Sequence, residues 1–293
     1  MMDCPRISLV TPSYNQAEYL EQTIISVVSQ GYPNCEYIVI DGGSVDGSAD
    51  ILRKYEKHLA FWDSALDRGQ SEAINKGFAK CTGDILGWLN SDDTLESCAL
   101  FDVAAAFANK NTKIIYGDCR ITDQQGNELK IIRPGPVSVW SLLKFWKENS
   151  IPPQPSIFFR SECLRQVGHL KEELHYGMDY DLWLRMADKY QFVYVPRILS
   201  NYRFHDKSKS ASEGGFNKFI PEWTRVANDF RKNKGTIFNW RYRIAVKTET
   251  QGGQKSLQTV FLELVGEYCR AKLTHIGGRC SQVFRGNTRG TMK

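Results

Sequence analysis

The sequence lacks the cysteine and histidine patterns that mark zinc sites and disulfide-rich folds. Its eight cysteines are scattered without a CxxC pair, and its five histidines form no cluster beside them. We therefore expect neither a structural zinc ion nor a disulfide framework. No apolar run approaches the roughly 20 residues of a membrane-spanning helix, and the first residues carry no signal-peptide pattern. These absences predict a cytoplasmic protein.

The GxGxxG fingerprint is also missing, which argues against a nicotinamide or flavin cofactor. No internal repeat and no low-complexity tract occurs. What remains is an ordinary globular composition of 293 residues, with 42% hydrophobic and 24% charged side chains. A chain of this length can bury a full core and carry a smaller appendage.

The net charge of +5 is unevenly distributed along the chain. Residues 206–293 contain 17 Lys and Arg against 7 Asp and Glu, a net charge of +10, whereas residues 1–205 carry −5. A basic segment can bind nucleic acid or anionic lipid, or form a solvated helical face. It has no recognition-helix or aromatic-interleaved pattern, so we expect no nucleic-acid partner. We expect a basic helical extension whose apolar stripe packs on its own domain by default, with a second subunit or a membrane surface as alternatives, and we predict peripheral contact with anionic lipid. Its apolar stripe consists of Leu257, Val260, Phe261, Leu264, Val265, Tyr268 and Ile276.

Strand-like and helix-like segments alternate before residue 206, which predicts an α/β sheet with crossover helices. The expected strands are 6–11, 36–40, 84–89, 113–116, 120–122, 129–132, 156–159 and 192–195, with a hairpin around 125–127. The expected helices are 18–30 with Asn15 as its cap, one carrying Ile51 to Tyr55, 71–80, 95–108, 139–146, 162–167 and 180–189.

The most informative motif is Asn90-Ser91-Asp92-Asp93, which follows the apolar run 85–89. Adjacent carboxylates at the exit of a buried strand lie where an α/β sheet opens its ligand crevice, so their charge needs a cation or a hydrogen-bonding partner. A divalent metal that carries a diphosphate meets this need. A helix N-cap before residues 94–96 is the alternative, and the motif alone does not decide between the two.

Two further loops have the composition of ligand-binding segments. Residues 41–48 follow a strand and contain three glycines, which let the backbone approach a ligand. Asp41 at the strand tip can accept from a base or ribose, although a plain glycine-rich turn is the alternative. Residues 67–77 hold cations for phosphate oxygens and amides for a ring or sugar, and surface exposure alone would also explain them. The side chains concerned are Arg68, Gln70, Asn75 and Lys76.

Acidic residues also occur at the start of the predicted helix near residue 180. Asp179 and Asp181 are two positions apart, so only one of them can face a crevice. Asp179 is nearer the loop and is the candidate general base, with N-capping as the alternative. His205, which is more often structural in such a position, can supply a metal or diphosphate contact.

Taken in order, residues 11–15, 41–48, 67–77, 90–93 and 177–185 resemble the family 2 glycosyltransferases with the GT-A fold. The resemblance covers roughly residues 5–210. It implies a nucleotide-diphosphosugar donor, Mg²⁺ or Mn²⁺, and inverting transfer to a hydroxyl of a glycan or lipid-linked glycan in cell-surface polysaccharide synthesis. It also implies a GT-A catalytic domain over residues 1–205, with a nucleotide-sugar half 1–117 and an acceptor half 118–205, followed by the extension 206–293.

The resemblance assigns roles to individual positions. Pro12 and Asp41 would contact the nucleotide, Asp92 would be the main metal ligand, and Asp179 would be the base. Asp93 and His205 are the further metal candidates. The remaining donor-contact candidates are Ser13, Tyr14, Gly43, Arg68, Gln70, Asn75, Lys76, Asn90 and Ser91.

Three positions depart from the pattern of that family. Gly42 and Asn90 stand where aspartates are common, and Met178 stands where an acid commonly precedes the base. A non-catalytic sugar-nucleotide-binding or glycan-binding protein is therefore one alternative. A sugar nucleotidyltransferase is another, although that class normally has a glycine-rich triphosphate loop where this chain has Thr-Pro-Ser-Tyr-Asn at 11–15.

Overall fold

The computed structural model describes residues 4–209, 215–236, 238, 239 and 242. The chain divides into two compact units, residues 1–227 and residues 228–293. The predicted apolar stripe from Leu257 to Ile276 lies outside the described residues. Within the second unit, the Arg231 guanidinium lies 4.3 Å from the centre of the Tyr242 ring. No helix in the described part of the chain is long and apolar enough to cross a membrane.

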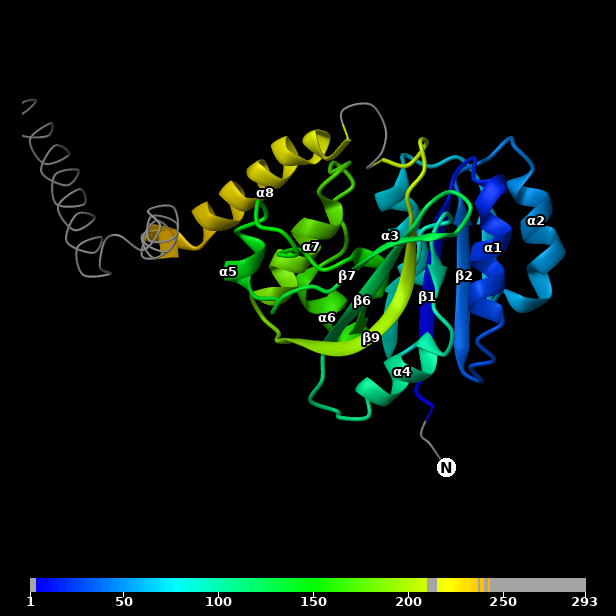
Figure 1. Ribbon diagram of the computed structural model, residues 1–293, viewed down its shortest axis with the longest axis horizontal. Coiled ribbons are helices and arrows are strands. Elements are labelled where there is room, and N and C mark those ends of the chain that lie inside the picture. Colours follow the sequence, from blue (N-terminus) through cyan, green and yellow to red (C-terminus); the bar gives the residue numbers. More distant parts are fainter. Residues whose placement is uncertain (1–3, 210–214, 237, 240–241, 243–293) are drawn as a thin grey trace, which may run out of the picture. The chain divides into compact units, whose positions relative to one another are not determined.

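The first unit is built on a nine-stranded mixed sheet with flanking helices (Figure 1). The strands are β1 (Ile7–Ser13), β2 (Cys35–Asp41), β3 (Phe61–Ser64), β4 (Ile85–Trp88), β5 (Thr94–Leu95), β6 (Ile114–Thr122), β7 (Glu128–Ile132), β8 (Ile157–Arg160) and β9 (Phe192–Arg203). Their order in the sheet is β3-β2-β1-β4-β8-β6-β9-β5, and β7 pairs with β6. The first four strands are parallel, whereas β8 runs antiparallel to both of its neighbours. The predicted α/β class is thus confirmed.

The helices alternate with the strands along the chain. They are α1 (Ala17–Val28), α2 (Ser48–Tyr55), α3 (Gln70–Lys80), α4 (Ala99–Ala106), α5 (Val139–Leu142), α6 (Ser161–Val167), α7 (Met178–Ala187) and α8 (Phe219–Asn233), with short 3₁₀ turns at Glu56–His58, Gln154–Ser156 and Gly215–Lys218. Every residue of β1 is buried, as expected for a parallel strand that is covered by helices on both faces.

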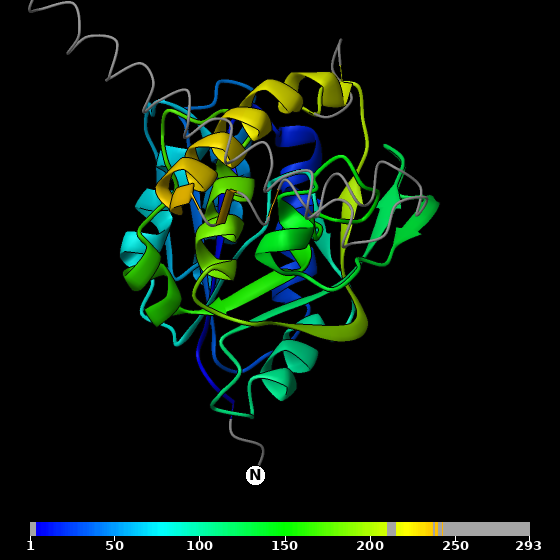
Figure 2. The ribbon, with the colours of Figure 1, turned by 90° about the vertical axis from the view of Figure 1, so that its left-hand side faces the viewer.

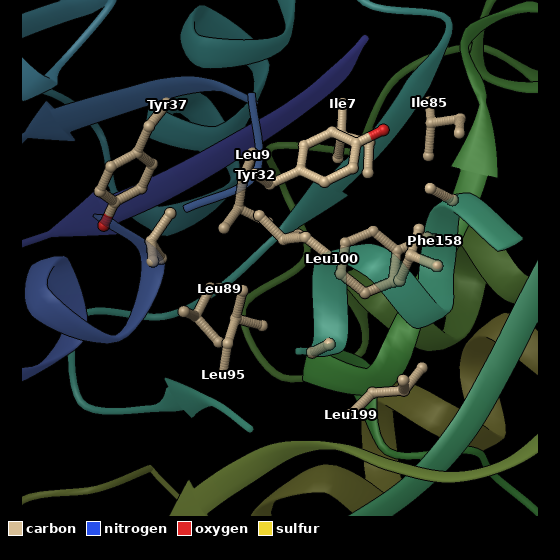
Figure 3. Packing of buried hydrophobic residues seen from close by; sticks show 14 of the residues in the cluster. Ile7, Leu9, Tyr32, Tyr37, Ile85, Leu89, Leu95, Leu100, Phe158 and Leu199 are labelled. Carbon is tan, nitrogen blue, oxygen red and sulfur yellow. The ribbon is translucent and has the colours of Figure 1, made fainter. Parts of the chain in front are cut away.

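Two layers of apolar side chains hold the sheet between its helices. On one face, residues of α1, α2 and α4 pack with β1 and β2 in a single cluster that includes Leu20, Leu52 and Leu100 (Figure 3). On the other face, Phe78 of α3 contacts Trp88 edge to face, and Trp88 stacks on Trp183 of α7 at 5.2 Å between ring centroids. These layers fix the carboxyl ends of the parallel strands in space.

Several predicted elements differ from the observed ones. The helix expected over 95–108 begins at Ala99, because Thr94 and Leu95 pair with Asn201 and Ser200 of β9. Asp93 therefore caps no helix, and that alternative reading of the motif was wrong. The segments 113–116 and 120–122 form one strand, β6, and its hairpin with β7 is confirmed. The helix expected over 139–146 ends at residue 142, and β3 was not predicted.

The cap of α1 was also predicted wrongly. Asn15 adopts a positive φ of 51° and accepts from Val45 N through Oδ1 at 3.1 Å. The helix N–H of Ala17 is instead satisfied by Asp46 Oδ2 at 2.8 Å. Hydrogen bonds between two loops thus replace a local cap, and they lock the loop after β1 to the loop after β2.

The strand order reverses between β1 and β4, since β2 and β3 extend the sheet to one side and β4 to the other. Both views show α4 near the end of the sheet where the chain enters β1, so the carboxyl end of β1 lies at the opposite edge (Figure 1 and Figure 2). Open α/β sheets bind their ligands at such a switch point, outside the carboxyl ends of the strands.

Candidate functional site

A pocket of about 500 Å³ opens at the switch point between β1 and β4. It brings together seven of the predicted site residues: Pro12, Ser13, Tyr14, Gln70, Asn90, Ser91 and Asp92. Tyr14 lines the pocket, and 62% of the residue is exposed to solvent. A larger cavity of about 730 Å³ is lined by residues of α4 and by Cys4, at the other end of the sheet, and none of the predicted site residues lines it.

Asp41 lies at the tip of β2, fully buried. Its Oδ2 accepts from Ser44 N at 2.9 Å and from Ser64 Oγ at 2.7 Å, and its Oδ1 accepts from Ser44 Oγ at 2.5 Å. The carboxylate therefore orders the loop after β2. Gly43, with a φ of 80°, lets this loop pack against the backbone of Leu66, which itself lines the pocket.

Asp92 and His205 meet at one side of the pocket. Nε2 of His205 lies 3.0 Å from Oδ2 of Asp92, and the imidazole is almost completely buried. The pairing joins the turn after β4 to the segment after β9, 113 positions along the chain. The ring of His205 also packs on Tyr19, with 4.6 Å between ring centroids, so its orientation is fixed by packing as well as by the carboxylate.

Asp93 points away from the pocket, into the protein. Its Oδ1 accepts from Arg203 N at 3.1 Å and its Oδ2 accepts from Asn90 Nδ2 at 3.2 Å. Burial, together with the adjacent charge of Asp92, raises the pKa of the Asp93 carboxyl well above its usual range. Of the two paired aspartates, Asp92 therefore lines the pocket, whereas Asp93 is an interior residue whose hydrogen bonds shape the turn.

Asn90 connects both walls of the pocket. Its Oδ1 accepts from Gln70 Nε2 at 2.7 Å, and its Nδ2 donates to Gln154 Oε1 at 3.2 Å as well as to Asp93. Gln154 in turn donates to Trp88 O at 2.7 Å. An aspartate at position 90 could accept but could not donate, so the amide suits this network.

Asp179 lies in the first turn of α7, where Gly177 is the N-cap residue. Its Oδ1 accepts from Tyr180 N at 2.7 Å, and burial raises the pKa of Asp179 to about 6. Asp181 has a different role: it is buried in ion pairs with Lys171 at 2.7 Å and Arg185 at 2.8 Å. Of the two acids in this turn, Asp179 is the one without such an ion pair among the described side chains.

Five predicted donor contacts lie outside the pocket wall: Asp41, Gly43, Arg68, Asn75 and Lys76. Arg68, whose side chain is 76% exposed, pairs with Glu72 at 2.9 Å, and Lys76 pairs with the same glutamate at 3.3 Å. Asn75 exchanges hydrogen bonds with the backbone of Leu170, at 2.9 Å and 3.1 Å. In the structure these last three side chains stabilise α3 and the loop that crosses it.

Other residues of the pocket wall were not predicted. They are Gln16, Gly42, Leu66, Asp67, Gly69, Ala73, His175, Tyr202, Lys207, Ser208 and Lys209. Lys209 Nζ donates to Gln70 Oε1 at 2.8 Å and to His175 O at 3.0 Å, and burial lowers its pKa. The sequence offers a weak signal for this part of the wall, namely two lysines within four positions of His205.

Of the predicted metal candidates, Asp92 alone lines the pocket. Among the described residues no group of three or more His, Cys, Asp or Glu side chains is placed to hold an ion. His205 does not line the pocket, and its almost completely buried ring pairs with the Asp92 carboxylate through Nε2. Mg²⁺ and Mn²⁺ in phosphate-handling sites often take only one or two carboxylates and complete their coordination with substrate phosphate and water.

The pocket and its two interlocked loops lie outside the carboxyl ends of parallel strands, which is where open α/β proteins bind their ligands. Residues 8–167 match the family described as glycosyl transferase family 2. Since this match covers more than half of the chain, the protein belongs to that family.

Relatives and solved structures agree with this membership. Rickettsial proteins named uncharacterized glycosyltransferases are 24–27% identical, and the chain spans 36–90% of their length. The O-antigen biosynthesis protein RfbC of Myxococcus xanthus is 32% identical over 198 residues, which make up 63% of this chain and 14% of RfbC.

Two solved structures share the fold. S. aureus TarS 1–349 in complex with UDP-GlcNAc has a TM-score of 0.62 at 17% identity, over 78% of this chain and 67% of that one. The mannosyltransferase PcManGT of Pyrobaculum calidifontis, in complex with GDP-Man and Mn²⁺, has a TM-score of 0.53 at 15% identity. The match covers 90% of this chain and 86% of PcManGT. The predicted GT-A fold is confirmed.

Proposed function

We propose that this chain is an inverting, metal-dependent glycosyltransferase that moves a sugar from a nucleotide-diphosphosugar to a hydroxyl acceptor. The observation that carries the proposal is the pocket at the β1–β4 switch point, whose wall combines Tyr14, Asp92 and Lys209. The aromatic ring suits a nucleotide base, and the charged groups suit a diphosphate with its metal. The solved complexes of TarS with UDP-GlcNAc and of PcManGT with GDP-Man and Mn²⁺ support this choice of donor.

In the proposed reaction, Asp92 would hold the metal, which when bound neutralises charge on the diphosphate, and His205 would orient the Asp92 carboxylate. The acceptor oxygen forms a bond to the anomeric carbon while the bond from that carbon to the diphosphate oxygen breaks. The electron pair of the broken bond leaves with the nucleoside diphosphate, and Asp179 takes the acceptor proton. A single displacement inverts the configuration at the anomeric carbon.

The pKa of Asp179 supports its role as the base. Burial raises this pKa to about 6, so the carboxylate is ionised at neutral pH yet binds a proton more readily than an exposed aspartate. Asp179 does not itself line the pocket, but the charge of Lys209, a residue of the pocket wall, acts on its pKa.

The proposal is tested with purified protein, Mn²⁺ and a panel of sugar nucleotides, by measuring release of nucleoside diphosphate and the anomeric configuration of the product. We expect release from at least one donor, and loss of roughly 10²–10⁴-fold in rate for Asp179→Asn. If no donor is hydrolysed or transferred, the proposal is refuted. Donor binding without turnover would instead favour the non-catalytic sugar-nucleotide-binding protein, for which Met178 and Asn90 are the arguments.

We also propose that the acceptor is a glycan or lipid-linked glycan of a cell-surface polysaccharide and that the reaction takes place on the cytoplasmic side of the membrane. The similarity to the O-antigen biosynthesis protein RfbC supports the first part. The net charge of +10 over residues 206–293 supports a peripheral contact with anionic lipid. Flotation of the full chain with anionic and with neutral vesicles tests this contact, and equal recovery in both would refute it.

A further inference from the structure

A second cavity, of about 730 Å³, lies at the end of the sheet opposite to the pocket at the switch point. It is lined by residues of α4 and α6 and of the segment that leads into β1, and it shares no residue with that pocket. We call it the α4 cavity. A molecule bound there would lie away from the proposed donor.

One wall of the α4 cavity is apolar. It is formed by α4 and the residues directly after it, namely Phe101, Ala104, Ala105, Phe107 and Ala108. Phe101 is 37% exposed, so the protein does not fully cover this wall. Apolar surface inside a cavity favours the binding of an apolar group, because that group is then removed from water.

The charged side chains of the cavity wall are mainly cationic. They are Lys110, Lys113, Arg160, Arg165, Asp84 and Glu162. A hydrogen bond from Lys113, together with the charges of this lysine and of both arginines, holds the pKa of Glu162 below its ordinary value. Three cations therefore act on this one carboxylate, and the wall as a whole carries two more positive than negative charges.

Two of the cations have no acidic partner at ion-pair distance. The Glu162 carboxylate pairs with Lys113 at 2.5 Å. Arg165 donates to the neutral hydroxyl of Ser161 at 3.0 Å. Among the described residues neither Arg165 nor Lys110 forms an ion pair. Both residues are exposed, so a ligand can reach them.

Arg160 joins the cations to the apolar wall. Its guanidinium lies 5.3 Å from the centre of the Phe107 ring and donates to Phe107 O at 2.9 Å and to Thr112 O at 3.0 Å. The positive charges and the apolar surface are thus adjacent in one cavity. A ligand that fills both parts needs an anionic group at one end and an apolar chain at the other.

A phosphate monoester fits the charged part of the cavity better than a carboxylate does. It carries a charge of roughly −1.5 to −2 at neutral pH, which matches the surplus of two positive charges. Its three terminal oxygens can accept from guanidinium and ammonium groups, which commonly bind phosphate in proteins. A carboxylate brings only one charge and two oxygens.

We propose that the α4 cavity binds a lipid phosphate monoester, with its phosphate on Arg165 and Lys110 and its chain along α4. This inference is separate from the proposed function, because no residue of the pocket at the switch point takes part. A lipid held at this end of the sheet leaves that pocket open. The site therefore suits attachment to a lipid and not transfer of a sugar.

The experiment is isothermal titration of the full chain with octyl phosphate, butyl phosphate, octanoate and octanol, each below its micelle concentration. We expect octyl phosphate to bind more tightly than butyl phosphate, by about three- to fourfold for each methylene group that is buried. Octanoate and octanol should each bind roughly 10-fold more weakly than octyl phosphate, or weaker still, since each lacks charge-assisted hydrogen bonds that the phosphate makes.

Variants locate the bound molecule. Arg165→Met and Lys110→Met should each weaken octyl phosphate roughly 10-fold. Ala105→Glu places a negative charge in the exposed apolar wall and should also weaken octyl phosphate roughly 10-fold, because the charge opposes both the chain and the phosphate. Lys57→Met and Ala60→Glu change exposed residues that line neither cavity and should match the wild type.

The proposal is overturned if octyl phosphate does not bind, or binds no more tightly than butyl phosphate or octanoate. Binding that none of the three cavity variants weakens would place the ligand elsewhere on the chain and would overturn it too. Arg165→Met and Lys110→Met test the same group of cations, so one of them suffices if the other does not fold. Release of nucleoside diphosphate is measured separately, so failure of this site leaves the proposed function standing.

Discussion

Replacing Asp179 by asparagine should lower activity and, at neutral pH, raise stability. Asp179 is held in the first turn of α7, where burial raises its pKa from the ordinary 3.8 to about 6. The native state therefore binds a proton between these values while the unfolded state has already released it. The contribution of the Asp179 carboxyl to the free energy of unfolding is therefore fully present below its pKa in the unfolded state, 3.8, and is lost as the pH rises through its pKa in the native state, about 6.

The magnitude follows from the size of the shift. A shift of about 2 pKa units corresponds to at most about 3 kcal/mol of stability, of which about 2 kcal/mol should be lost between about pH 4.5 and pH 7. Asparagine does not ionise in this range. The difference in unfolding free energy between Asp179→Asn and the wild type should therefore grow by about 2 kcal/mol over the same interval.

Two assays check this prediction together. Urea unfolding at several pH values gives the stability difference, and the pH profile of kcat/KM should rise through an ionisation near 6, because the base must be deprotonated. A stability difference that does not change with pH would show that Asp179 has an ordinary pKa. An activity profile without this ionisation, or an active Asp179→Asn variant, would remove the residue from the reaction.

Three other perturbations give separate outcomes. Asp92→Asn should abolish the Mn²⁺-dependent activity while leaving the melting temperature of the metal-free protein near that of the wild type; retained activity would refute the metal assignment. Gly77→Ala places a Cβ 2.3 Å from a methyl of the facing β1 valine, so urea unfolding should show a loss of about 1–3 kcal/mol, whereas Gly135→Ala, with no atom nearer than 4.0 Å, should be neutral. Glu222→Gln removes a negative charge that raises the pKa of Asp179, so the lower midpoint of the pH–activity profile should move to lower pH. An unchanged midpoint would contradict this coupling.

The donor side of the site was predictable from the sequence because it is built on parallel strands. The carboxyl ends of such strands meet at one edge, so polar residues that follow β1 and β4 had to lie close together. Pro12, Tyr14, Asn90 and Asp92 all line the pocket as a result. Strand type and chain order were sufficient for this inference.

The predictions failed where side-chain direction mattered more than position. Glu72 and Lys76 are four residues apart on α3, a spacing that places them in one row on the helix surface, and Arg68 lies just before the helix, four residues from Glu72. The ion pairs of Arg68 and Lys76 with Glu72 were therefore foreseeable from the spacing, whereas the polarity of the side chains alone suggested phosphate contacts. Gln70 begins the same helix but faces the pocket.

The alternative that Asp93 caps a helix was wrong because a long-range strand pairing determines the structure of the residues after it. The residues after it have the local pattern of a helix start, but Thr94 and Leu95 pair with β9 more than 100 residues later. The same partner strand brings Arg203, whose backbone N–H binds Asp93 and whose Nε donates to Asp92 O at 3.0 Å. No short sequence window contains the information for these contacts, because both depend on the register between β5 and β9.

The proposed base and its surroundings lie beyond the segment that matches the family. The match ends at residue 167, whereas the proposed base, Lys209 and Glu222 all follow it. Glu222 Oε2 accepts from the backbone N–H groups of His175, Tyr176 and Gly177, at 3.1, 2.7 and 2.8 Å. One carboxylate of α8 thus fixes the loop that precedes Asp179, and its charge also acts on the pKa of that residue. Because the contacts of Glu222 involve no strand of the sheet, Glu222→Gln should change the protonation of Asp179 while the hydrogen bonds of the loops after β1 and β4 stay intact.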